Sequence, residues 1–268
     1  HPHLSARFHT RLVDGGARIR TDVVMENTRT WTTAPGNITY SMVIKRNGVT
    51  LHTQPKFTHY HHARWHKVVW TGSSVEPQVR LRHHMPYFMA SKAVWNYNLA
   101  LEIPESVLAS QYALLSKNRS GQAALGPMGN VMLTPAFGTT GGRPEIGPLP
   151  QWTATYLISQ DSRAFEVMLA NSDAGAAVPV HYRDESSGQA LDLDRHPNVS
   201  TARGTSQPLL PTLVNGTTIW DPDTSHQASF AYVPYMITGD AFYQDELMFW
   251  AAWNFTYQSP GYRAGGQG

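Results

Sequence analysis

The fold of this chain is decided by a short motif that occurs twice, as Tyr156-Leu157-Ile158-Ser159-Gln160-Asp161 and as Tyr235-Met236-Ile237-Thr238-Gly239-Asp240. In each copy an apolar helix ends, Gln160 or Gly239 takes the C-terminal turn, and the aspartate is placed to accept hydrogen bonds from the free N–H groups of the next helix. The motif therefore predicts two helical hairpins, over residues 152–173 and 229–255.

The second predicted hairpin is rich in large apolar side chains on both sides of its break. Phe230 and Val233 precede the break, and Phe242, Phe249 and Trp250 follow it. Helices with this composition have to be buried against other helices. We therefore expect further helices to cover this hairpin, supplied by the same chain or by another.

The first part of the chain has the pattern of antiparallel strands. Residues 17–26 and 38–45 alternate apolar and polar side chains with a period of two. The dipeptide Asn47-Gly48 lies between two such segments and predicts a tight hairpin, because both residues tolerate positive φ. Residues 65–70 and 79–82 are two further expected strands. Together these strands predict a β-sandwich over residues 1–104.

The composition changes after Pro104, and this change divides the chain into three regions. Residues 105–117 favour a helix, whereas residues 126–150 are rich in Gly and Pro and predict a long loop. Loops of more than about 15 residues are usually functional, so this loop is a candidate wall of a site. We expect an α+β fold with a sandwich at 1–104, a linker and loop region at 105–150, and a helical hairpin domain at 151–268.

The composition excludes several classes of protein. Lys plus Arg number 21 and Asp plus Glu 19, and they are scattered, so no basic stripe for nucleic acid exists. The chain has no Cys, which excludes disulfides and zinc–thiolate sites. No apolar run approaches the roughly 20 residues that cross a bilayer. By contrast, 8 Trp, 12 Tyr, 9 Phe and 13 His suit sugar-binding clefts, because a pyranose has an apolar face and a rim of hydroxyls.

A strand-rich region followed by helical hairpins of this kind resembles the polysaccharide lyases and glycoside hydrolases in which a β-sandwich abuts an (α/α) toroid. The hairpins at 152–173 and 229–255 and the aromatic, polar loops before them carry the resemblance, which is architectural. It implies a polysaccharide or oligosaccharide partner and an extracellular or periplasmic location. A full toroid needs more hairpins, so we expect the natural protein to continue or other subunits to complete the surface.

The densest polar run of the chain is His59-Tyr60-His61-His62-Ala63-Arg64-Trp65-His66. If the run is a strand, His59 and His61 project from one face and present two imidazoles to a divalent metal, with a third ligand from His66 or from the pair His83-His84. No motif requires a cofactor, and a divalent metal at these histidines is one hypothesis; a copper site at the N-terminal His1 is a second and weaker one. The alternative is that these side chains decorate a sheet or line a sugar cleft.

The loops that lead into the hairpins hold the other candidate site residues. In toroids of the resembled type, ligands bind where such loops enter the inner helices. This places substrate-binding roles on Arg143, Trp152, Trp220 and Asp221, and catalytic roles on His226, Tyr232, Asp223 and Glu145.

Two chemistries fit these loop residues. His226 as general base with Tyr232 as proton donor suits β-elimination from a uronic acid, where Arg143 neutralises the carboxylate. Glu145 paired with Asp223 suits hydrolysis of a glycosidic bond. The segment around Asp221 and Asp223 also has the composition of an ordinary turn into a helix. The sequence thus indicates a carbohydrate-active protein, a lyase or a hydrolase, with a non-catalytic extracellular glycan-binding or surface-assembly protein as the alternative.

Overall fold

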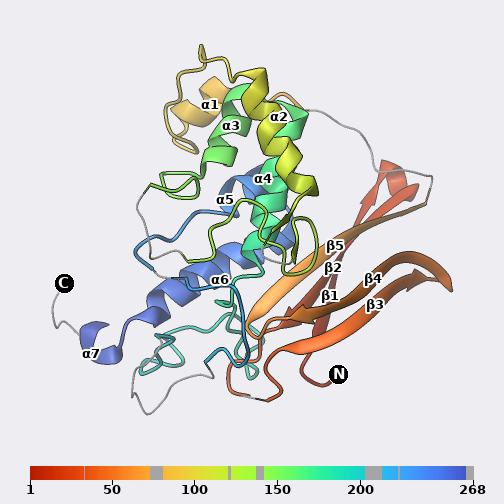
Figure 1. Cartoon of the computed structure of the whole chain (residues 1–268), viewed down its shortest axis with the longest axis vertical. Helices are drawn as coiled ribbons and strands as arrows, with labels where there is room; N and C mark the ends of the chain where they lie inside the picture. The colour runs from red at the N-terminus through yellow and green to blue at the C-terminus, as the bar shows by residue number, and fades with distance from the viewer. Residues whose placement is uncertain are drawn as a thin grey trace.

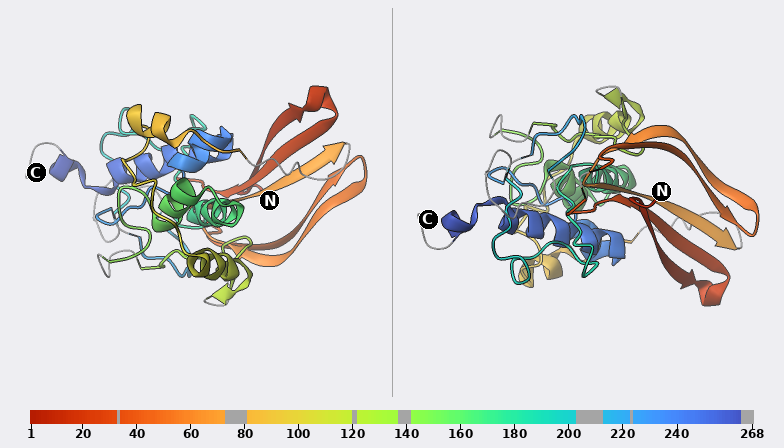
Figure 2. Two further views of the ribbon diagram at one scale, coloured as in Figure 1. Left: turned by 90° about the horizontal axis from the view of Figure 1, so that it is seen from above. Right: turned by 90° about the horizontal axis from the view of Figure 1, so that it is seen from below.

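The structure is a computed structural model of the chain. It describes residues 1–32, 34–72, 81–119, 122–136, 142–202, 213–222 and 224–263. The fold is α+β, as the sequence predicted, and Figures 1 and 2 show the strands on one side of the molecule and the helices on the other.

The strands form small antiparallel sheets. A three-stranded sheet has the order β1-β2-β5, and a separate hairpin pairs β3 with β4. A short ladder joins two-residue strands β6 and β7. The bounds are β1 Ser5–Val13, β2 Arg18–Asn27, β3 Ile38–Arg46, β4 Val49–His59, β5 Ala63–Gly72, β6 Asn118–Arg119 and β7 Gln122–Ala123.

The α-helices of the described chain begin at residue 85, after the strands of the two larger sheets. None of them combines the length and the apolar character that a bilayer-spanning segment needs. Their bounds are α1 Met85–Ala90, α2 Glu105–Ala113, α3 Gln151–Ser159, α4 Ser162–Gly175, α5 Tyr232–Thr238, α6 Ala241–Tyr257 and α7 Pro260–Arg263, with short 3-10 turns at Asp14–Gly16 and Leu114–Ser116.

The strand predictions are confirmed where they depend on local pattern. Asn47 and Gly48 have φ of 50° and 82° and join β3 to β4, as a tight hairpin requires. The expected segments at 17–26 and 38–45 correspond to β2 and β3. Strand β1 was not predicted, although its apolar side chains alternate with basic ones as in a half-exposed strand. Residues 79 and 80 of the expected strand at 79–82 lie outside the described residues, and residues 81 and 82 are irregular.

The assumption that the histidine-rich run is a single strand is wrong. Strand β4 ends at His59, β5 begins at Ala63, and the residues between them reverse the chain, with His62 at φ 58°. The sequence of this run gave no turn signal, since it contains neither Gly nor Pro. Because the chain reverses, His59 and His61 do not share one face of a strand.

Both helical hairpins are confirmed. Gln160 and Gly239 end α3 and α5 in the left-handed conformation, with φ of 50° and 61°. Asp161 caps α4 by accepting a hydrogen bond from the Arg163 backbone N–H at 2.8 Å. Asp240 occupies the same position before α6, but its side chain makes no cap hydrogen bond. It accepts two 2.8 Å hydrogen bonds from Arg20 instead, so the second break is tied to strand β2.

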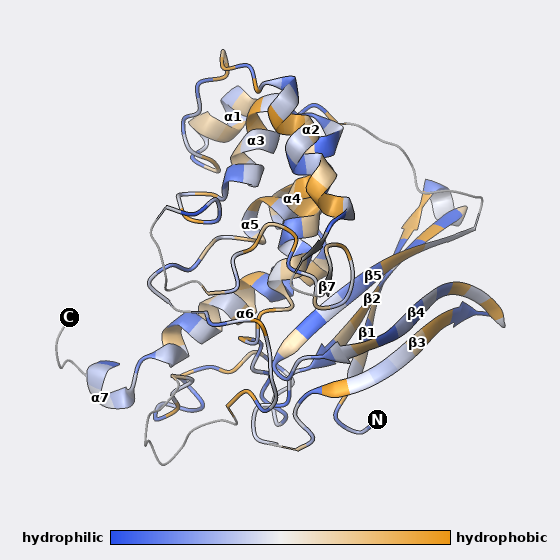
Figure 3. Ribbon diagram, in the orientation of Figure 1, coloured by the Kyte–Doolittle hydropathy of each residue, from blue (hydrophilic) through white to orange (hydrophobic). Residues whose placement is uncertain are grey.

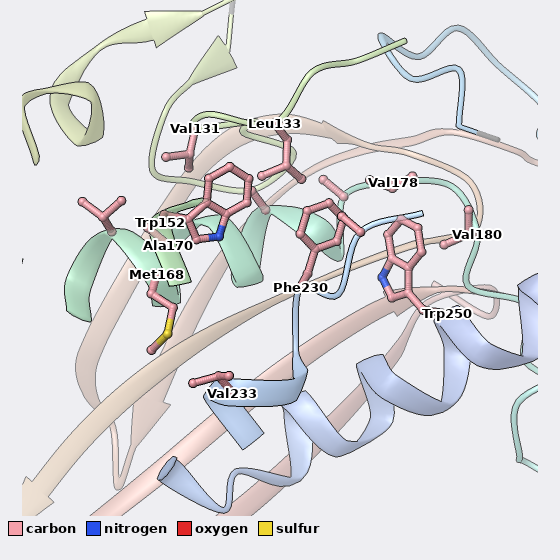
Figure 4. Close-up of a cluster of buried hydrophobic side chains, with 14 of the residues drawn as sticks. Val131, Leu133, Trp152, Met168, Ala170, Val178, Val180, Phe230, Val233 and Trp250 are labelled. Atoms are coloured by element: carbon pink, nitrogen blue, oxygen red, sulfur yellow. The ribbon is translucent and has the colours of Figure 1, made fainter. Parts of the chain in front are cut away.

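One apolar cluster runs through the described chain and includes side chains from strands, loops and helices. Trp152 lies 0% exposed and parallel to Phe230, at 6.3 Å between ring centroids and 7° between planes. Figure 4 shows these rings beside Trp250. The same cluster includes Met25 and Trp65 of the three-stranded sheet. It therefore crosses the boundaries expected at residues 104 and 150.

The two faces of the three-stranded sheet differ in character, because successive side chains of a strand point to opposite sides. Val23 and Val69 form an apolar cluster with Ile44 of β3. The other face carries Glu26 and Arg64 toward the helices. Figure 3 accordingly shows the first half of β5 as hydrophilic, although it passes through the interior of the molecule.

The Arg64 guanidinium joins the sheet to helix α6. The side chain is fully buried and donates to Glu26 Oε1 of β2 at 2.9 Å, Asp245 Oδ2 at 2.9 Å and Glu246 Oε1 at 2.5 Å. Its carbon Cζ also lies 4.9 Å from the ring centroid of Phe249. All three of its nitrogen atoms thus have carboxylate partners, which is the condition under which a buried charge is tolerated.

Glu26 is the acidic centre of the same network. It accepts hydrogen bonds from Arg64 and from Arg183, at 2.8 to 2.9 Å, and from Arg7 at 3.0 Å. Burial alone would raise the pKa of the Glu26 carboxyl, but these guanidinium groups outweigh it and lower the pKa to about 2. Glu26 therefore stays ionised throughout the neutral range.

We predict that Arg64→Leu lowers the free energy of unfolding by about 3–5 kcal/mol, because it leaves buried carboxylates without their cation. Urea denaturation measures the change. The control is Arg195→Leu, which removes an exposed ion pair to Asp192 at 2.7 Å and is expected to change stability by less than about 1 kcal/mol. Equal effects of the two substitutions would contradict the structural role of Arg64.

Candidate functional site

Several of the expected substrate-binding and catalytic side chains lie in the interior. Trp152 and Trp220 are buried, at 0% and 3% exposed. Glu145 is also buried, and its Oε1 accepts a hydrogen bond from the Thr134 backbone N–H at 2.8 Å. The two Trp side chains belong to the packed core, and Glu145 holds the backbone of the loop at Thr134. The residues that suggested a sugar contact in the sequence are therefore buried in the structure.

The segment before α5 separates the residues that the lyase hypothesis grouped together. The sequence led us to expect His226 and Tyr232 on one helix. His226 instead lies in a turn that precedes α5, whose first residue is Tyr232. Asp221 is exposed, and its backbone N–H donates to the Pro135 carbonyl at 2.8 Å. Asp223 lies outside the described residues. The Glu145–Asp223 pair therefore stays a prediction, and the Tyr232 hydroxyl donates to the backbone carbonyl of Ala93 at 2.8 Å.

Tyr232 and Arg143, by contrast, line two adjoining cavities on the helical side of the molecule. The cavities have volumes of about 480 and 570 Å³ and share the walls Trp95, Pro148 and Leu149. We call this surface the aromatic cleft; its main side chains are Lys92, Trp95, Tyr97, Arg143, Gln151 and Tyr232. The expectation that the 126–150 loop forms a wall agrees with the position of residues 142–149.

Local structure fixes the polar groups of the aromatic cleft. The Tyr232 hydroxyl donates to the Ala93 carbonyl at 2.8 Å and ties the first residue of α5 to the segment after α1. Arg143 Nη1 donates to the Ala136 carbonyl at 2.6 Å. Trp95 lies between α1 and α2 and is 61% exposed. A large indole left this open beside a cavity is typical of a ligand-contact residue.

The sequence also contains a local signal for Trp95. Residues 95–98 read Trp-Asn-Tyr-Asn, which alternates aromatic rings with amides in a segment without helical or strand pattern. Loops carry a large share of binding residues, so such a segment is a candidate for ligand contact. The position of this segment against residues 142–151 and Tyr232 depends on tertiary packing.

The three histidines expected to bind a metal do not converge. Within the described part of the chain, no three His, Asp or Glu side chains form a group that could hold an ion. His59 already uses both ring nitrogens: Nε2 lies 2.9 Å from the Ala63 carbonyl, and Nδ1 lies 3.0 Å from the Tyr40 hydroxyl. A carbonyl can only accept, so Nε2 carries the proton and Nδ1 accepts from Tyr40. This leaves no free lone pair on His59.

His61 and His66 lie in different surroundings. His61 Nδ1 accepts from the Asn215 backbone N–H at 3.2 Å, and its ring stacks on His62 with centroids 3.8 Å apart. His66 packs edge-on against Phe242 and faces helix α4. Desolvation lowers the pKa of His59 and of His61 to about 4, so both rings are neutral above that pH.

No family model, curated protein or solved structure matches this chain.

We predict that the free energy of unfolding decreases as the pH falls from about 6.5 to about 4, because the buried ring of His59 does not bind a proton in the folded protein. In this range the unfolded chain binds a proton at His59 and the folded chain does not, so the stabilisation present above pH 6.5 is lost, on the order of 3 kcal/mol. Urea denaturation at several pH values measures it. In His59→Gln the slope of unfolding free energy against pH should fall by about 1.4 kcal/mol per unit; an unchanged slope would contradict the assignment.

Proposed function

We propose that this chain is a carbohydrate-active protein that holds an acidic polysaccharide or oligosaccharide in the aromatic cleft. The observation that supports this most is the exposed indole of Trp95 beside Tyr232, at the junction of two cavities. A flat ring of this kind can stack on the apolar face of a pyranose, while neighbouring amides and hydroxyls meet its rim. Asn96, Gln151 and Ser229 provide such groups.

The charge of the aromatic cleft supports an acidic ligand. Lys92 and Arg143 are its charged residues, and neither Asp nor Glu is among the described residues that line it. A concave surface with charges of one sign raises the local concentration of oppositely charged ligands. A polymer of uronic acids fits this surface better than a neutral glycan.

Binding is better supported at this surface than catalysis. The described lining of the aromatic cleft includes no His and no carboxylate that could act as general base or acid. Tyr232 is the remaining candidate proton donor, and its hydroxyl is bonded to a backbone carbonyl. We therefore propose glycan binding as the main function. The second candidate function is that of a polysaccharide lyase or glycoside hydrolase, whose catalytic groups would come from residues outside this lining.

We also propose the finer architecture and location that the resemblance implies. The apolar contact of Val23 and Val69 with Ile44 is consistent with two sheets of a sandwich, and the hairpins α3–α4 and α5–α6 with part of an (α/α) toroid. Met248 and Phe255 of α6 are 47% and 65% exposed, which suits further helices from other subunits or more of the same chain. Binding of polysaccharide favours an extracellular or periplasmic location.

We predict that Trp95→Ala weakens retention on polygalacturonate at least tenfold in affinity electrophoresis, because it removes the stacking surface. The matched control is Phe8→Ala on β1, since Phe8 is 63% exposed and does not line the cleft. Its retention should equal that of the unsubstituted protein. Equal retention of all three proteins, or no retention of any, would refute binding in the aromatic cleft.

We predict that Lys92→Gln weakens binding of polygalacturonate and leaves binding of a neutral galactan unchanged, because only the charge of the side chain is lost. The effect should diminish as salt is added, since the Debye length shortens from about 10 Å at 0.1 M to about 3 Å at 1 M. Isothermal titration at two salt concentrations measures it. A loss that is equal for both polymers would argue against charge selection.

A further inference from the structure

The aromatic cleft is divided into two compartments by an apolar ridge. The first compartment has a volume of about 480 Å³, and the second has a volume of about 570 Å³. Trp95, Pro148 and Leu149 line both compartments and therefore form the ridge between them. Each volume lies in the range of about 300–1,000 Å³ that is usual for a small-molecule site. The cleft therefore has room for one or more sugar units on each side of Trp95.

The two compartments have matching sets of polar and aromatic residues. Each set consists of one basic residue, one carboxamide and one tyrosine. The set of the first compartment is Lys92, Asn96 and Tyr232, and that of the second is Arg143, Gln151 and Tyr97. None of these six residues lines both compartments, and the first compartment has Ser229 in addition. A ligand that repeats one chemical unit can therefore meet the same kinds of group twice.

The two sets are direct neighbours. Asn96 lines the first compartment and Tyr97 lines the second, although the Cα atoms of successive residues are only about 3.8 Å apart. Trp95, which precedes them in the chain, lines both compartments. A ligand that crosses the ridge therefore passes from one set to the other without an intervening sugar unit.

Hydrogen bonds to backbone carbonyls hold each set in place. In the first compartment, the Tyr232 hydroxyl of α5 donates to the Ala93 carbonyl at 2.8 Å. In the second compartment, the Gln151 backbone N–H at the start of α3 donates to the Pro144 carbonyl at 2.7 Å. The fold thus fixes the spacing of the two sets before a ligand arrives, so this spacing can select for the repeat of the ligand.

The charges of the two compartments limit the kind of repeat. Each compartment has one basic residue, and neither has an Asp or Glu among its described lining residues. A polymer with a carboxylate on every unit gives Lys92 and Arg143 one partner each. A polymer that alternates a uronate with a neutral sugar leaves one of these two residues opposite a neutral unit, so one favourable charge interaction is lost. The lining therefore favours a polymer in which every unit is acidic.

We propose that the aromatic cleft selects a homopolymer of uronic acid by binding two successive units, one in each compartment, with the glycosidic linkage over Trp95. The inference rests on the proposed function and adds to it the repeat of the ligand and its minimal length. It involves no chemical change of the ligand.

Isothermal titration with D-galacturonate, digalacturonate and trigalacturonate tests the minimal length. We expect digalacturonate to bind at least about tenfold more tightly than D-galacturonate, because its second unit binds as part of a ligand that is already attached. Trigalacturonate should gain much less over digalacturonate, since its third unit has no matching compartment. Equal affinities of the monomer and the dimer, or a second gain as large as the first, overturn the proposal.

Two nearly isosteric substitutions test the compartments separately. Asn96→Asp adds a carboxylate to the first compartment and Gln151→Glu adds one to the second, and both residues are exposed. Each should weaken binding of digalacturonate about fivefold, because the new carboxylate repels that of the sugar. The two effects should multiply to about 25-fold in the double variant.

Gln244→Glu on α6 is the matched control, because Gln244 is exposed and does not line the cleft. It makes the same change of charge and should leave the affinity for digalacturonate unchanged. If only one of the two cleft substitutions weakens binding, or if the control weakens it equally, the proposal is wrong.

A hyaluronan tetrasaccharide tests the repeat, because its uronates alternate with neutral N-acetylglucosamine units. We expect it to bind at least about fivefold more weakly than tetragalacturonate, since the two compartments cannot both hold a carboxylate of this ligand. Equal or tighter binding of the hyaluronan tetrasaccharide overturns the selection of a homopolymer.

Retention on polygalacturonate, compared between the unsubstituted protein and Trp95→Ala, reports on the proposed function alone. If retention depends on Trp95 but the monomer and the dimer bind equally, the inference of two compartments fails and the proposed function stands. If no galacturonate ligand binds, both fail.

Discussion

The rest of the structure depends on a buried guanidinium. The side chain of Arg64 on strand β5 donates hydrogen bonds to Glu26 of the neighbouring strand β2. It also donates to Asp245 and Glu246 of helix α6. Removing such a group from water costs several kcal/mol, and only complete pairing offsets that cost. The sheet and α6 are therefore held in one relative position, because a shift of either would leave a charge in the interior without a partner. An apolar interface would tolerate sliding more readily.

The same sheet packs in two different ways, because successive side chains of a strand point to opposite faces. Val23 and Val24 are adjacent in β2, yet Val23 contacts Ile44 of β3, while Val24 contacts Phe242 at the start of α6. On the helix side, Val24 lies beside the ion pairs and so helps to exclude water from them. The second set of ion pairs, in which Asp240 binds Arg20 and Arg11, joins the break between α5 and α6 to strands β1 and β2.

The concave surfaces of the molecule differ in their polar chemistry. The aromatic cleft has exposed rings and basic side chains but no acid or imidazole in its described lining. The pocket between β5 and α4 has imidazoles and a carboxyl in its described lining instead. The aromatic cleft is the surface at which we propose that a long charged polymer binds.

Sequence reasoning grouped residues that the structure places in different surroundings. Arg143 and Tyr232 were expected there and line the aromatic cleft, whereas Trp152 and Glu145 came from the same reasoning and are buried. A tryptophan in an amphipathic segment has the same sequence signature whether its ring meets the core or a ligand. Trp95 was missed because its segment lies between short helices without a periodic pattern.

The sequence by itself determined the features that depend on neighbouring residues: the Asn47-Gly48 turn, the period of β2 and β3, and the left-handed ends at Gln160 and Gly239. These follow from local backbone sterics and from hydrogen bonds a few residues apart. Only the tertiary structure decided the partners of Arg64, the reversal at residues 60–62, the change of Asp240 from helix cap to ion-pair partner, and the assembly of both cavities. Each of these joins residues far apart in the chain, and the energy of such contacts is not encoded in any local pattern.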